Sequence, residues 1–238
     1  MKIPGKKIEA EFIARLNRFV AKVRLNNEII DVHVPNSGRL RELLVPGARV
    51  ILREKASPVR KYKYDVIMVY KGDKLISVDS QLPNRFMTDL LTRGDQHIYR
   101  RIELEKLLRF TYIKPEVRYK NSRFDLGLGE NKKIVYFAEI KGVTLVENNI
   151  AFFPDAPTQR GTKHLEELIE AKQEGFGAGV IFVIQRQDAE FFAPNDRMDP
   201  SFGETLRRAV ATGVDVFPFK CSIKPEEIVF DDMVKLIL

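Results

Sequence analysis

The sequence predicts a protein of mixed class, α/β in its second part and α+β overall, in which a small β-barrel precedes a larger domain of alternating strands and helices. Short apolar runs separated by turn signals fill residues 11–80, whereas helical patterns begin after Pro83-Asn84. No Gly/Ser-rich linker separates the two parts, so we expect them to pack together. The predicted domains are residues 1–84 and residues 85–238.

The first domain is predicted to contain five strands, with turns at Asn26-Asn27 and at Gly72. The strands are expected over residues 12–25, 29–34, 49–54, 64–70 and 75–79. An OB-like barrel requires five strands and commonly binds oligonucleotides on one face. An SH3-like barrel has the same number of strands and is the alternative architecture. We expect an OB-like five-stranded barrel that contacts nucleic acid.

The turn at residues 35–38 is a candidate phosphate-binding site. It precedes a predicted short helix over residues 40–44. Backbone amides at such a turn, together with Arg39 and Arg41, suit a phosphate group. A turn that only changes the direction of the chain is the alternative, and both interpretations stay open.

A second basic segment of the barrel contains Lys61 and Lys63, with Tyr62 and Tyr64 interleaved. Alternating cations and aromatic rings are typical of surfaces that bind single strands of nucleic acid. An exposed loop with no such role is the alternative interpretation.

The larger domain is predicted to have the order helix, three strands, helix, strand, which we write αβββαβ, with one more helix and strand appended. The helices are expected over residues 85–93, 96–110 and 158–174 and between a capping box at Ser201 and Gly213, and the strands over residues 116–120, 123–128, 133–140, 150–153, 179–184 and 214–219. At about 100° per residue, Glu105 is expected near the centre of the apolar stripe of its helix.

Residues 123–141 are predicted to bring two acids and a lysine together. Asp125 lies on one strand, and Glu139 and Lys141 share a face of the next, because side chains alternate along a strand. Two carboxylates and the Ile140 carbonyl can hold Mg²⁺ or Mn²⁺, while an ammonium orients water or stabilises charge. The pattern resembles the core of the PD-(D/E)XK restriction-endonuclease-like fold. A cross-strand ion pair is the alternative interpretation.

Other polar residues are candidates for the same site. Glu105 or Glu116 would support a metal-bound water or a second ion. The residues expected to hold DNA phosphates or to support the metal and its water are Arg123, Arg160, Lys163, Asp155, Gln159 and His164. A structural hydrogen-bonded residue is the alternative for His164, and a helix cap is the alternative for Asp155.

The chain has 40 Lys+Arg against 33 Asp+Glu, a net charge of +7. This excess favours a polyanionic partner, and we expect DNA bound mainly through its phosphates; a well-solvated surface is the alternative. One cysteine and three histidines exclude an intramolecular disulfide and a Cys- or His-rich zinc site. With no signal-peptide core and no apolar run of about 18 residues, we expect a cytoplasmic protein without membrane contact.

Four motifs, VPNSGRL, SRFD, AEIKGVTL and FFPDAPTQRGTKHLEEL, have an order and spacing that resemble the sugar fermentation stimulation protein (SfsA) family over nearly the full chain. The resemblance implies an OB-like barrel joined to a PD-(D/E)XK domain, with Asp125, Glu139 and Lys141 at the nuclease-motif positions. It also implies DNA binding and a link to the regulation of sugar utilisation. Phe124 replaces the proline of the motif, and DL replaces the family's usual DF; we expect both exchanges to be harmless.

Two functions follow from these observations. The first is a DNA-binding protein with a metal-dependent phosphodiester-hydrolysing site, that is, a Mg²⁺- or Mn²⁺-dependent deoxyribonuclease. The alternative is a non-catalytic DNA-binding regulator of sugar-utilisation genes that retains the nuclease fold. A nucleotide- or sugar-binding regulator is a weaker candidate, because the sequence has no glycine-rich phosphate loop.

Overall fold

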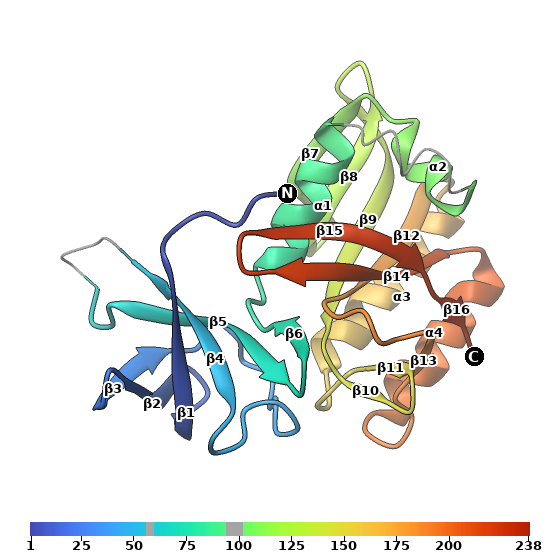
Figure 1. Ribbon diagram of the computed structural model, residues 1–238. Helices are drawn as coiled ribbons and strands as arrows, with labels where there is room; N and C mark the ends of the chain where they lie inside the picture. The colour runs from blue at the N-terminus through green and yellow to red at the C-terminus, as the bar shows by residue number, and fades with distance from the viewer. Residues whose placement is uncertain (56–59, 94–101) are drawn as a thin grey trace.

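The computed structural model describes residues 1–55, 60–93 and 102–238. A small barrel formed by the first third of the chain lies beside a larger body of strands and helices (Figure 1). The expected start of the second helix, residues 96–101, lies outside the described ranges. Among the described residues, no helix combines the length and the apolar character that crossing a membrane requires.

The barrel is closed by a pairing between its third and fifth strands. Its sheet has the order β3-β2-β1-β4-β5-β6, and a bridge between His33 and Asp65 joins β3 to β5, so that five strands form a ring and β6 extends it as a hairpin. The strands are β1 (Lys7–Asn17), β2 (Val20–Leu25), β3 (Glu28–His33), β4 (Arg49–Glu54), β5 (Tyr64–Lys71) and β6 (Lys74–Ser77). This arrangement confirms the five-stranded barrel.

Two local predictions for the barrel were wrong. Residues 12–25 form two strands rather than one, because the chain reverses between Asn17 and Val20, which pair with each other. Residues 40–44 form turns rather than a helix. Leu40 has φ 50°, a left-handed conformation that does not continue a right-handed helix. Its side chain and that of Leu43 are nevertheless buried in the barrel core.

The larger domain is built on a six-stranded sheet of order β15-β14-β12-β9-β8-β7, in which β9, β12 and β14 are parallel and the other pairs are antiparallel. A four-stranded sheet of order β10-β11-β13-β16 packs beside it. The strands are β7 (Tyr112–Tyr119), β8 (Ser122–Glu130), β9 (Lys133–Val143), β10 (Val146–Glu147), β11 (Ile150–Phe153), β12 (Gly177–Ile184), β13 (Phe191–Pro194), β14 (Asp215–Lys224), β15 (Glu227–Met233) and β16 (Lys235–Leu236).

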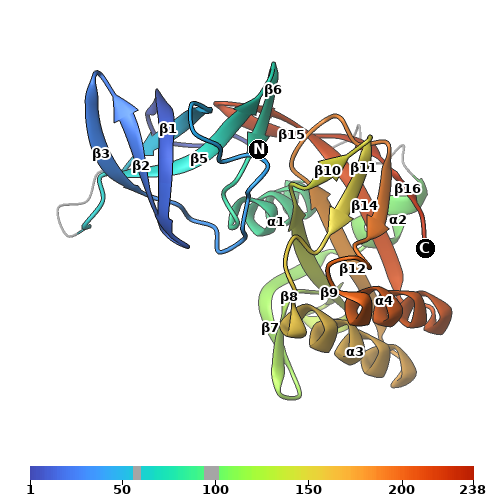
Figure 2. The same cartoon turned by 90° about the horizontal axis from the view of Figure 1, so that it is seen from below.

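Helices cover both faces of this sheet. The helices are α1 (Leu82–Arg93), α2 (Ile102–Leu108), α3 (Gln159–Gln173) and α4 (Pro200–Thr212). Helices α3 and α4 lie side by side on one face, where their apolar residues share a core with β12, whereas α1 and α2 share the other core with β14 (Figure 2). The predicted order αβββαβ is confirmed, and the additional strands surround it.

Three details of the helices differ from the predictions. Helix α1 begins at Leu82 rather than at residue 85, with Pro83 in its first turn, where the missing N–H costs nothing. The N-cap of α4 is Asp199, whose carboxylate accepts from the Phe202 amide, rather than Ser201. Glu105 is exposed, so it does not face the core as expected. The buried residues of α2 centre on Leu104, about 100° round the helix from Glu105.

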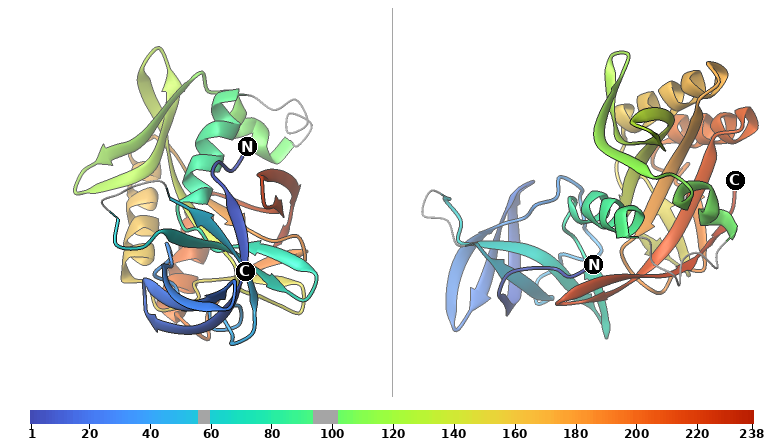
Figure 3. Two further views of the ribbon diagram at one scale, coloured as in Figure 1. Left: turned by 60° about the vertical axis from the view of Figure 1, so that its left-hand side comes forward. Right: turned by 90° about the horizontal axis from the view of Figure 1, so that it is seen from above.

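The barrel and the larger domain are joined by a shared core and by backbone hydrogen bonds. Ile51 and Met68 of the barrel belong to the same apolar cluster as Phe86 of α1. At the other end of the chain, the Met1 nitrogen donates to the Ile228 carbonyl at 2.7 Å, across 227 positions of sequence. Strand β15 reaches the barrel at this point (Figure 3). The two domains therefore pack as one body.

A buried ionic network strengthens this junction. Asp65, 2% exposed, contacts Arg53 at 3.1 Å, and Arg53 also contacts Asp79 at 3.2 Å. Asp79 accepts from Arg85 of α1 at 2.7 Å, so the network runs from the barrel to the first helix of the larger domain. Burial alone would raise the pKa of Asp65, but hydrogen bonds from His33 and Arg53 and nearby cations hold it below its ordinary value.

We expect Asp65→Asn to destabilise the protein by about 1.5–3 kcal/mol at neutral pH, because it removes one of the two carboxylates that the buried Arg53 contacts and leaves Asp79 as the other. Since the folded-state pKa is lowered, the contribution of Asp65 is present above its unfolded pKa of about 3.9 and is lost as the pH falls through the folded value. Denaturant unfolding at about pH 7 and about pH 3 measures both effects.

Asp31→Asn is the matched control, because Asp31 forms an exposed pair with Lys22 on the barrel surface. Its effect should stay below about 1 kcal/mol. An Asp65→Asn effect of that same size, or one that grows as the pH falls, would contradict the role assigned to the network.

Candidate active site

The candidate site lies where β8 and β9 run side by side. The register pairs Leu126 with Ala138, so Asp125 and Glu139 occupy neighbouring positions on the two strands. The Asp125 Oδ2 accepts a hydrogen bond from the Ile140 backbone N–H at 2.8 Å. Asp125, Glu139 and Lys141 are therefore brought together, as the strand alternation predicts.

Glu139 is a buried carboxylate, 3% exposed, and a lysine and a histidine contact it. Its Oε1 accepts from Lys141 Nζ at 2.6 Å and contacts His164 Nδ1. Burial by itself would raise the pKa of Glu139, but His164 and Lys141 outweigh it and lower the pKa. The second oxygen, Oε2, is buried and has no hydrogen-bond partner among the described residues. The protein therefore binds one oxygen of this carboxylate, and the other oxygen can accept from or coordinate a further group.

Asp125 has a different environment. Among the described residues, no cation contacts its carboxylate directly; the Asn84 amide donates to Oδ1 at 2.6 Å, and the Ile140 N–H donates to Oδ2. Burial and the charge of Glu139 raise its pKa to about 6, even though these two hydrogen bonds and Lys141 act in the opposite direction. The two acids are thus electrostatically coupled, and they repel one another when both are ionised.

Helix α3 is placed so that His164 reaches the sheet. Thr158 caps its N-terminus by accepting from the Gly161 amide at 3.0 Å. His164 is buried between Glu139 and Arg160, whose Nε donates to Nε2 at 3.4 Å. His164 is therefore a buried, hydrogen-bonded residue, as the alternative interpretation expects, and its carboxylate partner is Glu139 of the site.

The other residues of α3 lie farther from Glu139. Lys163 is exposed and lies 3.7 Å from the buried Glu167, and Gln159 is exposed at the first position of the helix. Asp155, for which a loop or a helix cap was the alternative to a site role, lies in the loop before α3, and the cap is Thr158. The Asp155 carboxylate accepts from the Arg39 amide at 3.0 Å and so joins the two domains.

The expected third carboxylate is not assembled around these acids. Glu105 is exposed on α2, and the Glu116 carboxylate is exposed and pairs with Arg123 at 3.4 Å. Within the described part of the chain, no group of three or more His, Cys, Asp or Glu side chains is arranged to hold a metal ion. Two carboxylates suffice for Mg²⁺, which keeps several of its waters. The orphaned Oε2 of Glu139 beside Asp125 is the donor arrangement that such an ion fits.

A cavity of about 590 Å³ opens beside Asp125. Helix α1 contributes Asn84, Arg85 and Arg93 to its wall, and Glu116 lines the same cavity. None of these three α1 residues was predicted from the sequence to belong to the site. Pro83 was the signal that could have identified them, because proline favours the first turn of a helix. The segment that we interpreted as a domain boundary is in fact the start of α1.

The predicted phosphate-binding segments of the barrel are only partly suited to that role. The Gly38 amide donates to Asn36 Oδ1 and the Arg39 amide to Asp155, so these turn amides are not available to a phosphate. The side chains of Arg39 and Arg41 are exposed. Lys63 pairs with Glu54 at 3.0 Å, and Lys61 lies over the Tyr62 ring at 5.4 Å.

Comparison with known proteins shows similarity over the whole chain. One family model, described as the SfsA N-terminal OB domain, matches residues 13–78, and a second, the sugar fermentation stimulation protein RE domain, matches residues 81–227. The barrel is therefore of the OB type, and the SH3-like alternative is excluded.

Individual relatives agree with these matches. A sugar fermentation stimulation protein homolog of Clostridium tetani is 48% identical over 229 residues, covering 96% of each chain, and one of Clostridium acetobutylicum is 47% identical over 238 residues, covering 100% of each. Among solved structures, Pyrococcus furiosus SfsA in complex with Ca²⁺ is 27% identical, with a TM-score of 0.82, and covers 100% of this chain and 98% of the other.

Asn84→Ala is expected to raise the pKa of Asp125 above about 6, because it removes a hydrogen bond that favours the ionised carboxylate. Carboxyl NMR titration of Asp125 measures this shift. Thr92→Ala is the matched control, since Thr92 lines the same cavity but donates only to the Thr88 carbonyl within α1. An unchanged or lowered pKa in Asn84→Ala would contradict the contact.

Proposed function

The chain belongs to the sugar fermentation stimulation protein family, and from this premise we propose that it is a DNA-binding protein whose larger domain hydrolyses phosphodiester bonds with Mg²⁺ or Mn²⁺. The observation that carries the proposal is the pairing of Asp125, with its raised pKa, and the buried Glu139, one oxygen of which has no partner among the described residues. Two coupled carboxylates of this kind are stabilised by a divalent cation.

Asp125, Glu139 and the Ile140 carbonyl are the groups that would hold the ion. A bound Mg²⁺ or Mn²⁺ supplies Lewis-acid activation of a phosphoryl oxygen and lowers the pKa of a bound water. The relative from Pyrococcus furiosus was solved in complex with Ca²⁺, which, like Mg²⁺, prefers oxygen ligands. That complex supports the assignment of a divalent cation to this family's fold.

The other residues of the cluster orient these carboxylates. Lys141, paired with Glu139 at 2.6 Å, carries an ammonium that can orient an attacking water or stabilise the charge that develops on the phosphate. His164 donates its Nδ1–H to the same carboxylate oxygen and holds its orientation, so it acts as a positioning residue. Arg85 and Arg93 line the cavity beside Asp125, where they pair with Asp79 and Asp89. We assign these two cations to contacts with the phosphates of DNA bound at the cavity.

DNA is the proposed partner because of charge as well as fold. The chain has a net charge of +7, and cationic proteins bind DNA largely through its phosphates. We assign Arg39, Arg41, Lys61, Arg123, Arg160 and Lys163, all exposed or partly exposed, to such contacts. The proposed location is the cytoplasm, where DNA and free Mg²⁺ are both accessible.

One observation favours a second function, that of a non-catalytic DNA-binding regulator of sugar-utilisation genes. Lys141 and His164 both contact Glu139 Oε1, so this oxygen is held by the protein without any metal ion. In that case the acids and the lysine would serve the stability of the sheet, and the protein would bind DNA without cutting it.

A divalent cation is expected to raise the melting temperature of the wild-type protein. At a concentration about 100 times its Kd, the gain in stability is about 2.7 kcal/mol. The gain should be lost in Asp125→Asn and Glu139→Gln, which remove the charge of each ligand, and kept in Glu166→Gln, whose carboxylate pairs with Arg208 on the exposed face. Equal stabilisation of all four proteins would show that the cation binds elsewhere.

Nuclease activity is tested by incubating supercoiled, linear and single-stranded DNA with the protein and Mg²⁺, Mn²⁺ or EDTA. We expect metal-dependent cleavage by the wild type and a loss of about 10²-fold or more in Asp125→Ala and in Lys141→Ala. The Glu166→Gln control should cleave like the wild type. If the wild type binds DNA without cleaving it under any of these conditions, the regulator function replaces the nuclease function.

A further inference from the structure

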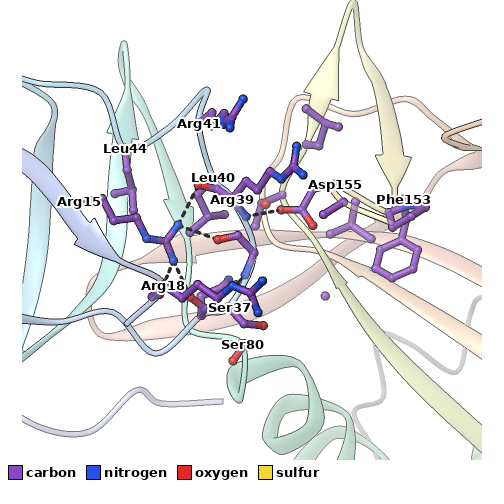
Figure 4. Close-up of a pocket in the computed structure, with 18 of the residues that line it drawn as sticks. Arg15, Arg18, Ser37, Arg39, Leu40, Arg41, Leu44, Ser80, Phe153 and Asp155 are labelled. Carbon is purple, nitrogen blue, oxygen red and sulfur yellow. Dashed lines mark hydrogen bonds between the residues drawn. The ribbon is translucent and has the colours of Figure 1, made fainter. Parts of the chain in front are cut away.

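A second and larger cavity, of about 990 Å³, lies between the barrel and the larger domain (Figure 4). The barrel contributes the turn between β1 and β2 and the loop of residues 36–46, and the larger domain contributes the end of β9 and the segment from β11 to α3. Its lining does not include Asp125, so it is distinct from the cavity at the candidate active site. The protein therefore has a second concave surface, formed by both domains.

Unpaired arginines line this cavity. Arg18, Arg39 and Arg41 are exposed, and none of their guanidinium groups has a hydrogen-bond or ion-pair partner among the described residues. This distinguishes them from most of the exposed cations elsewhere, such as Lys63, Arg207 and Arg208, which pair with acids. Three free guanidinium groups in one cavity are suited to an anion with several charges.

A fourth arginine holds the cavity wall in place. Arg15 donates to the backbone carbonyls of Gly38 at 2.6 Å and of Asn36 at 2.7 Å, and also to those of Arg18 and Arg39. The N–H groups of its guanidinium thus donate to backbone carbonyls of the wall, while its positive charge adds to that of the cavity. Among the described residues that line the cavity, Asp155 is the only acid, and its carboxylate is engaged with the Arg39 amide. The cavity therefore has an excess of positive charge.

The rest of the lining is apolar or offers an unused acceptor. Leu44 and Val45 of the barrel and Phe152 and Phe153 of the larger domain line the cavity. Gln185, 1% exposed, lines the same cavity, and its Oε1 is buried without a hydrogen-bond partner among the described residues. The amino groups of nucleobases are donors of the kind this oxygen lacks.

Cations beside aromatic and apolar side chains are the combination that binds single-stranded nucleic acid, whose bases are free to stack. A duplex presents mainly its phosphates, and its bases remain stacked inside the helix. The volume of the cavity lies near the upper end of the range for small-ligand sites, so the cavity suits a short single-stranded segment and is too small for a duplex. Gly142, the residue after Lys141 on β9, lines the cavity, so the strand that carries Lys141 reaches the cavity wall.

We propose that the cavity between the domains binds a short single-stranded segment of DNA, with its phosphates on Arg18, Arg39 and Arg41 and its bases against the apolar wall. The inference rests on the proposed function and specifies its substrate class: DNA that has a single-stranded end, flap or gap. The barrel and the larger domain bind this segment together, and the candidate active site acts on the DNA that leaves the cavity.

The test is fluorescence anisotropy in EDTA, which prevents cleavage, with single-stranded DNA of about 15 nucleotides and a blunt duplex of the same length. The wild type should bind the single strand at least about tenfold more tightly. Arg18→Ala/Arg39→Ala/Arg41→Ala should weaken single-strand binding by about tenfold to hundredfold and reduce the slope of log K against log salt by about 2. Ser37→Glu, which adds a negative charge to the cavity at an exposed position, should weaken it as well.

The control is Arg207→Ala/Arg208→Ala/Lys224→Ala, which removes the same net charge from exposed ion pairs outside the cavity. It should bind the single strand within about twofold of the wild type. Equal affinity for both DNAs, or equal losses in the two triple variants, would overturn the inference. Asp125→Ala should bind the single strand like the wild type. A wild type that never cleaves, but binds single strands through these arginines, would refute the hydrolysis and leave the cavity assignment intact.

Discussion

The buried carboxylate of Glu139 is the constraint on which the rest of the site depends. An ionised acid that is 3% exposed in a sheet must be matched by cations and hydrogen bonds, because isolated burial of a charge costs several kcal/mol. Lys141 comes from the same strand, but His164 comes from α3, so the helix must lie where its imidazole reaches β9. In the described part of the chain, Asp125 has neutral donors alone, and they do not offset burial and the charge of Glu139, so its pKa is raised while that of Glu139 is lowered.

Patterns of short range could be read from the sequence, and contacts of long range could not. Asp125, Glu139 and Lys141 were predictable because strand alternation and one turn fix their relative positions. Glu105 was wrongly predicted to face the core. The apolar stripe inferred from the sequence of α2 was wider than the face that is buried, and tertiary packing determines that face. Asn84 was not identified, since nothing local indicates that its amide reaches an aspartate 41 positions later.

The barrel is held in a fixed position against the site by the junction. Arg53, inside the barrel, contacts Asp79, and Asp79 contacts Arg85, the residue next to Asn84 on α1. Ile51 and Met68 pack into the same core as Phe86. A shared core of this kind opposes the independent domain motion that is usual for smaller, more polar interfaces. The shape of the cavity between the domains is therefore a property of the folded chain, and no ligand is needed to create it.

The hydrogen bond between Met1 and Ile228 also bears on the order in which the molecule assembles. Domains generally fold as units, beginning with the N-terminal one while the ribosome is still adding residues. The barrel can close as soon as β5 is available to pair with β3, but the segment before β1 has its partner only once β15 has been made. Contacts of such high sequence separation form slowly, because loop closure is opposed by entropy. The contact between the segment before β1 and strand β15 is thus among the last parts of the protein to be completed during synthesis.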